Sequence, residues 1–205
     1  AKMLVESPED SDEVEGAISL LNRAIFLSPL DDRLFETRAE AYCLLADVDS
    51  AVSDLRYVVA RNSGLPKVRH RLAELLAMKG HEYSNDEERA CECCSEAASL
   101  DPLRAHYWIS CAVSKTKLGD FNGALENVNR AIDIEEAAEQ YILRAKIHWA
   151  MCLTEAGIKD MRTAEALDPT HAEVVSFTER LLVTTASLYQ AATAAMSRGD
   201  FKLAI

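Results

Sequence analysis

A spacing that recurs along the chain constrains its fold more than any other feature of the sequence. Five apolar segments open on a small residue and end 12 residues later at a proline or a residue in its place. A second small residue lies 12 residues before several of these openings, and 9 or 10 residues after the preceding end. The resulting period of 34 residues is typical of a repeat architecture. The five segments are Ala17–Pro29, Ala51–Ser63, Ala90–Pro102, Ala124–Glu136 and Gly157–Pro169.

The repeating unit is predicted to be a pair of helices. The chain of 205 residues contains only 7 Gly and 5 Pro, which suits long helices joined by short turns better than a sheet with many turns. Small residues at fixed positions allow two helices to cross closely, and larger apolar residues fill the groove beside them. One hairpin cannot bury its own apolar face, so neighbouring hairpins must stack. The predicted fold class is therefore all-α, a solenoid of helical hairpins.

The residues at these positions resemble the tetratricopeptide repeat family. The family pattern places an aromatic residue, then Leu-Gly or Arg-Ala, then Tyr on the first helix of each hairpin, and Ala, Phe, Ala and Pro on the second. The resemblance covers nearly the whole chain and implies a right-handed α-α superhelix with an inner groove. The matching residues are Phe35, Arg38, Ala39 and Tyr42, then Trp108, Ala112, Gly119, Phe121, Ala124 and Ala131, then Tyr141, Arg144, Ala145, Met161, Ala164 and Pro169.

We interpret residues 1–205 as a single array cut from a longer protein, because neither end shows a polar capping helix. Residues 79–86 add five residues to the third repeat, which predicts either a longer turn or an extended first helix. The insertion is read as a tolerated surface feature or as a contact loop for a partner. The array divides into a partial repeat 1–30, repeats 31–65, 66–103, 104–137 and 138–170, and an extended helix 171–198 that opens a truncated repeat running to 205.

The extended helix is predicted because residues 171–198 contain neither Pro nor Gly and carry apolar residues at helical spacing. A helix of about 28 residues is roughly twice the usual length in globular proteins. We expect its first half to overhang the stack and to cover a neighbouring repeat or another chain.

The charge and the cysteine content limit the classes of partner and the cellular compartment that we expect. The formal net charge of −12 disfavours nucleic acid, whose phosphates require a basic surface. No apolar run is long enough for membrane insertion. The six cysteines show no disulfide spacing and the acidic opening is unlike a signal peptide, so we expect an intracellular, cytoplasmic protein.

No catalytic, cofactor-binding or metal-ligating residues are predicted, and the chain is not expected to be an enzyme. Cys91, Cys93 and Cys94 lie close in sequence, but their helical spacing does not bring three thiolates to one point. Cys94 is expected in the core, with Cys91 and Cys93 pointing elsewhere. The histidines are scattered over different repeats, and no phosphate-binding glycine loop is present.

The inner groove is the candidate protein-binding site. In the family the first helix of each hairpin lines this groove, and the corresponding exposed positions here form an apolar patch edged by lysines. Such a patch suits an apolar peptide segment with acidic flanks. In the alternative interpretation, the extended helix or a flanking repeat packs there. The groove residues are His106, Ile109, Val113, Lys117, Ile142, Lys146 and Trp149.

A basic patch is a second candidate, formed by residues that interrupt the acidic background. It is either a solvated face or a docking surface for an acidic partner. The residues are Arg56, Arg61, Lys67, Arg69 and Arg71.

These features predict a protein-interaction scaffold within a larger assembly. The arrangement also resembles long multi-repeat members of the family associated with cilia, flagella and sperm, which implies a structural component of the axoneme with axonemal or microtubule-associated partners. The alternative is a recruiting region of an enzyme or a chaperone adaptor whose other domains lie outside this segment. Chaperone-binding members carry Lys and Asn where this chain has Glu36 and Glu40, which argues against a chaperone-tail clamp.

Overall fold

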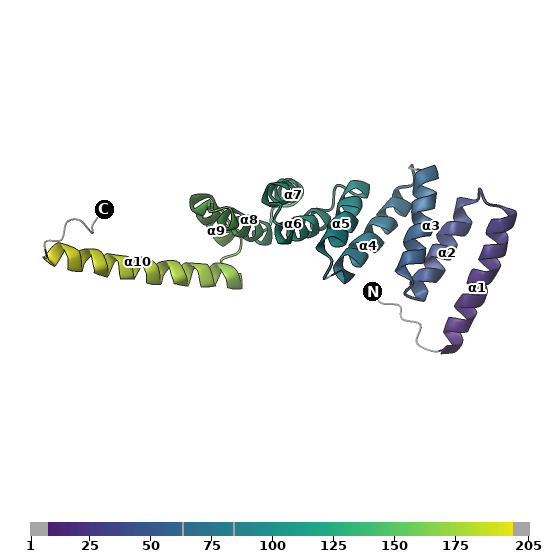
Figure 1. Cartoon of the computed structure of the whole chain (residues 1–205), viewed down its shortest axis with the longest axis horizontal. Helices are drawn as coiled ribbons and strands as arrows, with labels where there is room; N and C mark the ends of the chain where they lie inside the picture. The colour runs from purple at the N-terminus through teal and green to yellow at the C-terminus, as the bar shows by residue number, and fades with distance from the viewer. Residues whose placement is uncertain (1–7, 63, 84, 199–205) are drawn as a thin grey trace. The chain divides into compact units, whose positions relative to one another are not determined.

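The computed structural model describes residues 8–62, 64–83 and 85–198, which form ten α-helices and no strand (Figure 1). The predicted all-α class of helical hairpins is confirmed for these residues. The contacts divide the chain into two compact units, residues 1–134 and 135–205. Residues 1–7 of the predicted partial repeat and residues 199–205 of the predicted truncated repeat lie outside the described residues.

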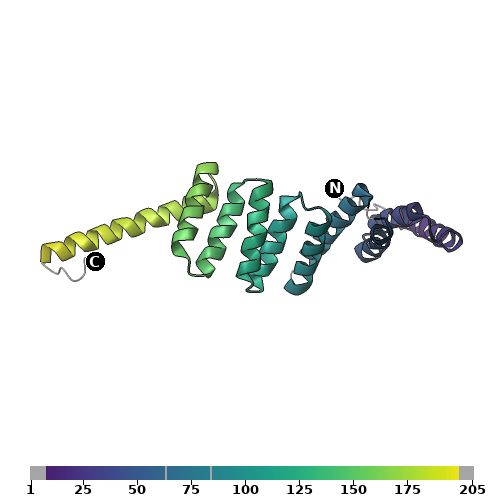
Figure 2. The ribbon, with the colours of Figure 1, turned by 90° about the horizontal axis from the view of Figure 1, so that it is seen from above.

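The first unit contains seven helices, and each packs against its neighbour in sequence (Figures 1 and 2). Three hairpins, α2–α3, α4–α5 and α6–α7, follow a first helix that packs on α2. The helices are α1 (Pro8–Leu27), α2 (Asp32–Leu44), α3 (Val48–Arg61), α4 (Pro66–Glu82), α5 (Glu87–Leu100), α6 (Ala105–Lys117) and α7 (Phe121–Ile134).

Aspartates begin several of these helices. The carboxylate of Asp47 accepts a hydrogen bond from the backbone N–H of Ser50 at 3.1 Å, and Asp86 accepts one from Arg89 at 3.1 Å. A side-chain oxygen at this position satisfies one of the N–H groups that the first helical turn leaves unpaired. These caps fix where each helix starts and so keep the connecting turns short.

The small residues that set the period lie where the helices cross. Ala39 and Ala51 are buried between α2 and α3, and Ala112 and Ala124 between α6 and α7. Any larger side chain at these positions would separate the two backbones. The spacing in the sequence therefore follows from the packing.

Four of the five extra residues of the third repeat lengthen its first helix, and the fifth lengthens the following turn. Helix α4 has 17 residues, whereas α2 and α6 have 13 each. The longer helix brings a further small residue to the crossing, because a Cβ atom on Gly80 would lie 3.0 Å from Cys94 Sγ and 3.4 Å from the Ala90 carbonyl oxygen. Of the two alternatives that the sequence left open, the structure has the extended first helix.

The second unit consists of α8 (Ala138–Ala150), α9 (Thr154–Leu167) and α10 (Ala172–Arg198). Helices α8 and α9 form a hairpin, with Ala145 and Ala164 fully buried between them. Helix α10 is continuous over 27 residues. None of the described helices in either unit is both long and apolar enough to cross a bilayer.

The first half of α10 covers the neighbouring repeat, which is one of the two expected arrangements, but it does not overhang. Val174 is buried, Phe177 stacks on Trp149 of α8, and Glu173 pairs with Lys146 of α8. In the second half, residues 182–191 are exposed instead. An apolar pattern of helical period runs through both halves, so the sequence alone does not say which half is packed.

Three hairpin turns contain a residue in the left-handed region of backbone conformation. Its φ angle is 59° at Ala46, 81° at Gly119 and 62° at Cys152, and these residues close the α2–α3, α6–α7 and α8–α9 turns. Glycine adopts this conformation readily, whereas other residues bring their Cβ atom too close to the following carbonyl oxygen. Two of the three turns are therefore strained.

Replacing Cys152 with glycine is expected to raise the free energy of unfolding by about 1 kcal/mol, because the strain at positive φ is removed. Urea denaturation of the Cys152→Gly variant measures this gain. Leu153→Gly is the matched control, since Leu153 has an ordinary φ of −88° and glycine there only adds freedom to the unfolded chain. If Cys152→Gly lowered the free energy of unfolding as much as Leu153→Gly does, the strain at Cys152 would be contradicted.

Candidate functional site

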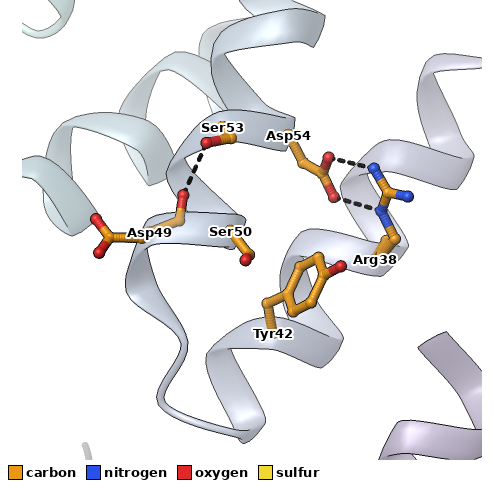
Figure 3. A pocket seen from close by; sticks show the side chains of 6 residues that line it. All are labelled: Arg38, Tyr42, Asp49, Ser50, Ser53 and Asp54. Carbon is orange, nitrogen blue, oxygen red and sulfur yellow. Dashed lines mark hydrogen bonds and ion pairs between the residues drawn. The ribbon is translucent and has the colours of Figure 1, made fainter.

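A buried ion pair joins the two helices of the second repeat. The Arg38 guanidinium donates from Nε to Asp54 Oδ2 at 2.8 Å and from Nη2 to Oδ1 at 2.6 Å (Figure 3). Asp54 is only 6% exposed. Bidentate bonds of this kind fix the geometry as well as the charge. The pair therefore holds α2 against α3 in one orientation.

The same pair recurs in the fifth repeat. Arg144 of α8 donates from Nε and Nη2 to the two carboxylate oxygens of Asp160 in α9, at 3.0 and 2.6 Å. His148 Nδ1 lies 2.9 Å from the same carboxylate. The fourth repeat has buried Cys111 and Asn127 at the equivalent positions.

Sequence reasoning used Arg38 and Arg144 as family positions and missed their partners. In both repeats the aspartate follows the arginine by 16 residues. This recurring spacing was the signal that could have identified the pairs.

A pocket of about 290 Å³ lies beside the first of these pairs, between α2 and α3 (Figure 3). The charged side chains that line it are already paired. Arg38 binds Asp54 within the pocket, and Asp49 pairs with Lys79 of the neighbouring helix α4. The Ser53 hydroxyl donates to the Asp49 carbonyl oxygen at 2.9 Å. These contacts stabilise the hairpin and give the pocket no arrangement of nucleophile and base.

Three of the six cysteines, on α5 and α6, lie in the core. Cys93, Cys94 and Cys111 are all buried, so Cys93 does not point away from the core as the sequence suggested. A hydrogen bond to Cys111, together with burial, raises the pKa of the Cys94 thiol, and burial raises the pKa of Cys91 and Cys93. A raised pKa keeps the thiols protonated and unreactive. Among the described residues, no cluster of three or more His, Cys, Asp or Glu side chains is placed to hold a metal ion.

The groove residues predicted in the fourth repeat all lie on α6, in the first unit. His106 is exposed, Val113 is 38% exposed and Ile109 is half-buried. Partial desolvation of its ring and the nearby charge of Arg104 lower the pKa of His106, so its imidazole is neutral at neutral pH. Lys117 Nζ lies 2.6 Å from Glu87 Oε1 at the start of α5. The accessible part of this surface is therefore largely apolar and uncharged.

The groove residues predicted in the fifth repeat lie on α8, in the second unit, where α10 contacts them. The rings of Trp149 and Phe177 are stacked with centroids 5.6 Å apart, and Lys146 Nζ lies 2.6 Å from Glu173 Oε2. Ile142 is buried. The extended helix thus packs against Trp149 and Lys146, as in the alternative interpretation of the groove. A groove that joins the α6 and α8 residues stays a prediction.

The predicted basic patch is divided between α3 and α4, and most of its side chains bind neighbouring helices. Arg56 Nε donates to Glu96 of α5 at 2.9 Å, and Arg61 donates to the carbonyl oxygens of Pro29 and Leu30 at 3.1 and 3.2 Å.

The α4 residues of this patch are similarly engaged. Arg69 donates to the Leu100 carbonyl oxygen at 2.6 Å, and Arg71 pairs with Glu74, while Lys67 is exposed. Arginines that bind the last carbonyl groups of a helix satisfy acceptors that would otherwise lack a partner. The docking of an acidic partner on this patch stays a prediction.

Comparison with known proteins places this architecture among helical-repeat proteins. No family model matches the chain. It is 28% identical over 172 residues to tetratricopeptide repeat protein 16 of Mus musculus, a match that covers 82% of this chain and 22% of that protein. The chain thus spans about a fifth of the length of the curated relatives that it matches.

Two solved structures share the fold. YrrB, described as a TPR protein with an unusual peptide-binding site, superposes with a TM-score of 0.55 at 12% identity, over 83% of this chain and 86% of YrrB. The first TPR of Spaghetti (RPAP3), bound to an HSP90 peptide, gives a TM-score of 0.52 at 21% identity, over 57% of this chain and 95% of that one.

The stacked hairpins and their close helix crossings define an α-solenoid. With the 34-residue period and the likeness to repeat proteins of known structure, the chain has the fold of tetratricopeptide repeat proteins.

Proposed function

We propose that this chain is a non-catalytic protein-interaction scaffold within a larger assembly, and that the inner face of its first helices binds segments of partner proteins. The apolar surface of α6 carries this proposal, because Val113 is exposed to solvent in the middle of a helix. The exposed part of Val113, with the half-buried Ile109 one turn before it, suits the apolar side chains of a partner. The peptide-binding sites described for YrrB and Spaghetti support this function by analogy of fold.

The rigidity of the hairpins supports the same function. Arg38 and Asp54 fix α2 on α3, and Lys117 ties α6 to Glu87 of α5. A surface that is already ordered loses little conformational entropy when a partner binds. The partner is expected to be an extended or helical segment with apolar side chains, since His106 is neutral and Lys117 is already paired.

The assembly we propose is the axoneme of cilia or flagella, in which the chain would hold neighbouring proteins in place. This finer proposal rests on the resemblance to long multi-repeat proteins of that kind. The alternative is a recruiting region of an enzyme or a chaperone adaptor. The HSP90 peptide in the Spaghetti complex supports the adaptor, but Glu36 and Glu40 on α2 would repel the terminal carboxylate of such a peptide.

Val113→Asp is expected to abolish partner binding. A carboxylate on the apolar surface of α6 would lose its hydration in the complex, and this is costly without a partner group of opposite charge. Capture of partners from a ciliated-cell extract, followed by mass spectrometry, measures the loss. Leu103→Asp is the matched control, since Leu103 is also exposed but lies in the turn before α6. Retained binding by Val113→Asp would remove the α6 surface from consideration.

Cross-linking mass spectrometry of the native complex tests the assembly. Lys117 and Lys115 lie at the end of α6 and are suitable reactive positions. We expect their cross-links to join cytoskeletal proteins. Cross-links to soluble chaperones alone would contradict the axonemal role and favour the adaptor.

A further inference from the structure

A group of thiols and one hydroxyl links α5 to α6. Ser95 Oγ lies 3.7 Å from Cys111 Sγ and 4.0 Å from Cys91 Sγ. The thiols of Cys94 and Cys111 are hydrogen-bonded to each other across the same interface. Cys94 and Cys111 are buried, whereas Cys91 is half-buried and Ser95 is exposed. These four residues form a thiol cluster that extends from the core to the surface.

Cys94 lies where α4, α5 and α6 pack in succession (Figure 1). A Cβ atom on Gly80 of α4 would lie 3.0 Å from Cys94 Sγ, so this sulfur packs directly against the glycine. The same sulfur contacts Cys111 of α6. The neighbouring Cys93 lies instead near the charge of Lys79 on α4. The fold therefore pairs Cys94, and not the adjacent cysteine, with Cys111.

The two paired thiols differ in protonation. Hydrogen bonds from Cys94 and Ser95, with the charge of Lys115, lower the pKa of the Cys111 thiol, although burial opposes this shift. The hydrogen bond to Cys111, together with burial, raises the pKa of the Cys94 thiol. Because the thiolate is the form that attacks an electrophile, Cys111 is the nucleophile of the pair. A thiol of lowered pKa beside a second thiol is the arrangement of redox-sensitive cysteines.

We propose that the thiol cluster is a site of reversible oxidation, at which hydrogen peroxide converts Cys94 and Cys111 into a disulfide that joins α5 to α6. The Cys111 thiolate attacks one oxygen of the peroxide, the O–O bond breaks, and Cys111 becomes a sulfenic acid. The hydroxide that leaves takes up the proton that Cys111 released. Cys94 then attacks the sulfenic sulfur, and the sulfenic oxygen leaves with the Cys94 proton as water. The two cysteines lose two electrons, and one hydrogen peroxide becomes two molecules of water.

The first step of this oxidation prepares the second. The hydrogen bond to Cys111 and the negative charge of its thiolate hold the proton on Cys94. A sulfenic acid is neutral, so its formation removes this charge and allows Cys94 to ionise and attack. The oxidant enters from the surface side of the cluster, where Ser95 is exposed.

The disulfide joins two consecutive repeats, because α5 is the second helix of one hairpin and α6 is the first helix of the next. A cross-link between repeats limits the freedom of the unfolded chain and so stabilises the stack. Val113 stays exposed on α6, since Cys111 lies on the buried face of that helix. The proposal does not depend on partner binding at Val113, so either can fail without the other.

Mass spectrometry of the folded chain after treatment with hydrogen peroxide tests the oxidation. The remaining thiols are alkylated, and trypsin then places the two cysteines in peptides 90–104 and 105–115. We expect a disulfide between these peptides that dithiothreitol reverses. The exposed Cys152 thiol is the internal measure of the oxidant dose. The absence of linked peptides at a dose that fully oxidises Cys152 would overturn the proposal.

Single alanine variants identify the partner of Cys111, because peptide 90–104 contains three cysteines. Cys94→Ala is expected to abolish the link between the two peptides. Cys91→Ala and Cys93→Ala are the matched controls and should keep it. Circular dichroism checks that each variant is folded. A link that survives in Cys94→Ala would show that another thiol reacts, and the proposed pairing would be wrong.

Oxidation of the parent chain in urea tests the pairing without any substitution. The loops that close from Cys91, Cys93 or Cys94 to Cys111 differ in length by at most three residues, so an unfolded chain should form them about equally. We expect the folded chain to link Cys94 alone. Equal use of the three cysteines in the folded chain would show that the fold does not select Cys94 and would overturn the proposal.

Discussion

Asp160→Ala is expected to lower the free energy of unfolding by about 3 kcal/mol, one of the two largest effects that the structure predicts. The carboxylate is 4% exposed and accepts hydrogen bonds from Arg144 Nε and Nη2, with His148 Nδ1 also 2.9 Å away. Its removal leaves a guanidinium in a partly buried site without its carboxylate. Breaking one side of a buried pair costs more than the pair itself contributes, because the remaining charge is no longer compensated. The 23% exposure of the Arg144 side chain places the value at the lower end of the usual range.

Urea denaturation followed by far-ultraviolet circular dichroism measures the loss. The double variant Arg144→Leu, Asp160→Leu is the control, because it removes both charges and should lie closer to the parent than Asp160→Ala does. A single variant within 1 kcal/mol of the parent, or a double variant that is as unstable as the single one, would contradict the role of this pair.

Asp54→Ala in the second repeat should cost less than Asp160→Ala, because Asp160 contacts His148 Nδ1 at 2.9 Å in addition to Arg144. The comparison between the two aspartates therefore measures what the histidine contact adds to an ion pair of the same geometry.

The hairpins could be predicted from the sequence because close helix crossings leave little choice of side chain. Ala39, Ala112 and Ala145 are fully or almost fully buried, and a larger residue at any of them would force two backbones apart. A steric requirement of this kind is visible as a spacing. The spacing also located the third-repeat insertion, but both of its placements fit the same count. The structure shows that most of the insertion lengthens α4, and Gly80 in the added turn packs against Cys94.

The candidate site was harder to predict because it depends on which surfaces other helices cover. Val113 is exposed as its helical position suggests, whereas Trp149 occupies an equivalent kind of position and is stacked on Phe177. The sequence gives the face of a helix but not the orientation of the next helix over it. The Arg–Asp pairs were missed for a similar reason, since two positions become partners only after the register of both helices is known.

Gly157→Val is expected to lower the free energy of unfolding by about 3 kcal/mol and to release the first half of α10 from α8. A Cβ atom on Gly157 would lie 2.2 Å from Trp149 Nε1 and 2.6 Å from its Cδ1, so the whole indole must move. The indole of Trp149 also stacks on the ring of Phe177 in α10. Moving the indole therefore separates these two rings. Valine and glycine are both poor helix formers, so the difference in propensity contributes little.

Gly16→Val is the matched control for this substitution. Gly16 lies within α1, and a Cβ atom there meets nothing within 4 Å, so its stability should stay within about 0.5 kcal/mol of the parent. Urea denaturation gives the stability of both variants, and limited proteolysis after Arg180 reports whether α10 has left α8. Protection of Arg180 in Gly157→Val equal to that in the parent would show that Trp149 does not fix α10.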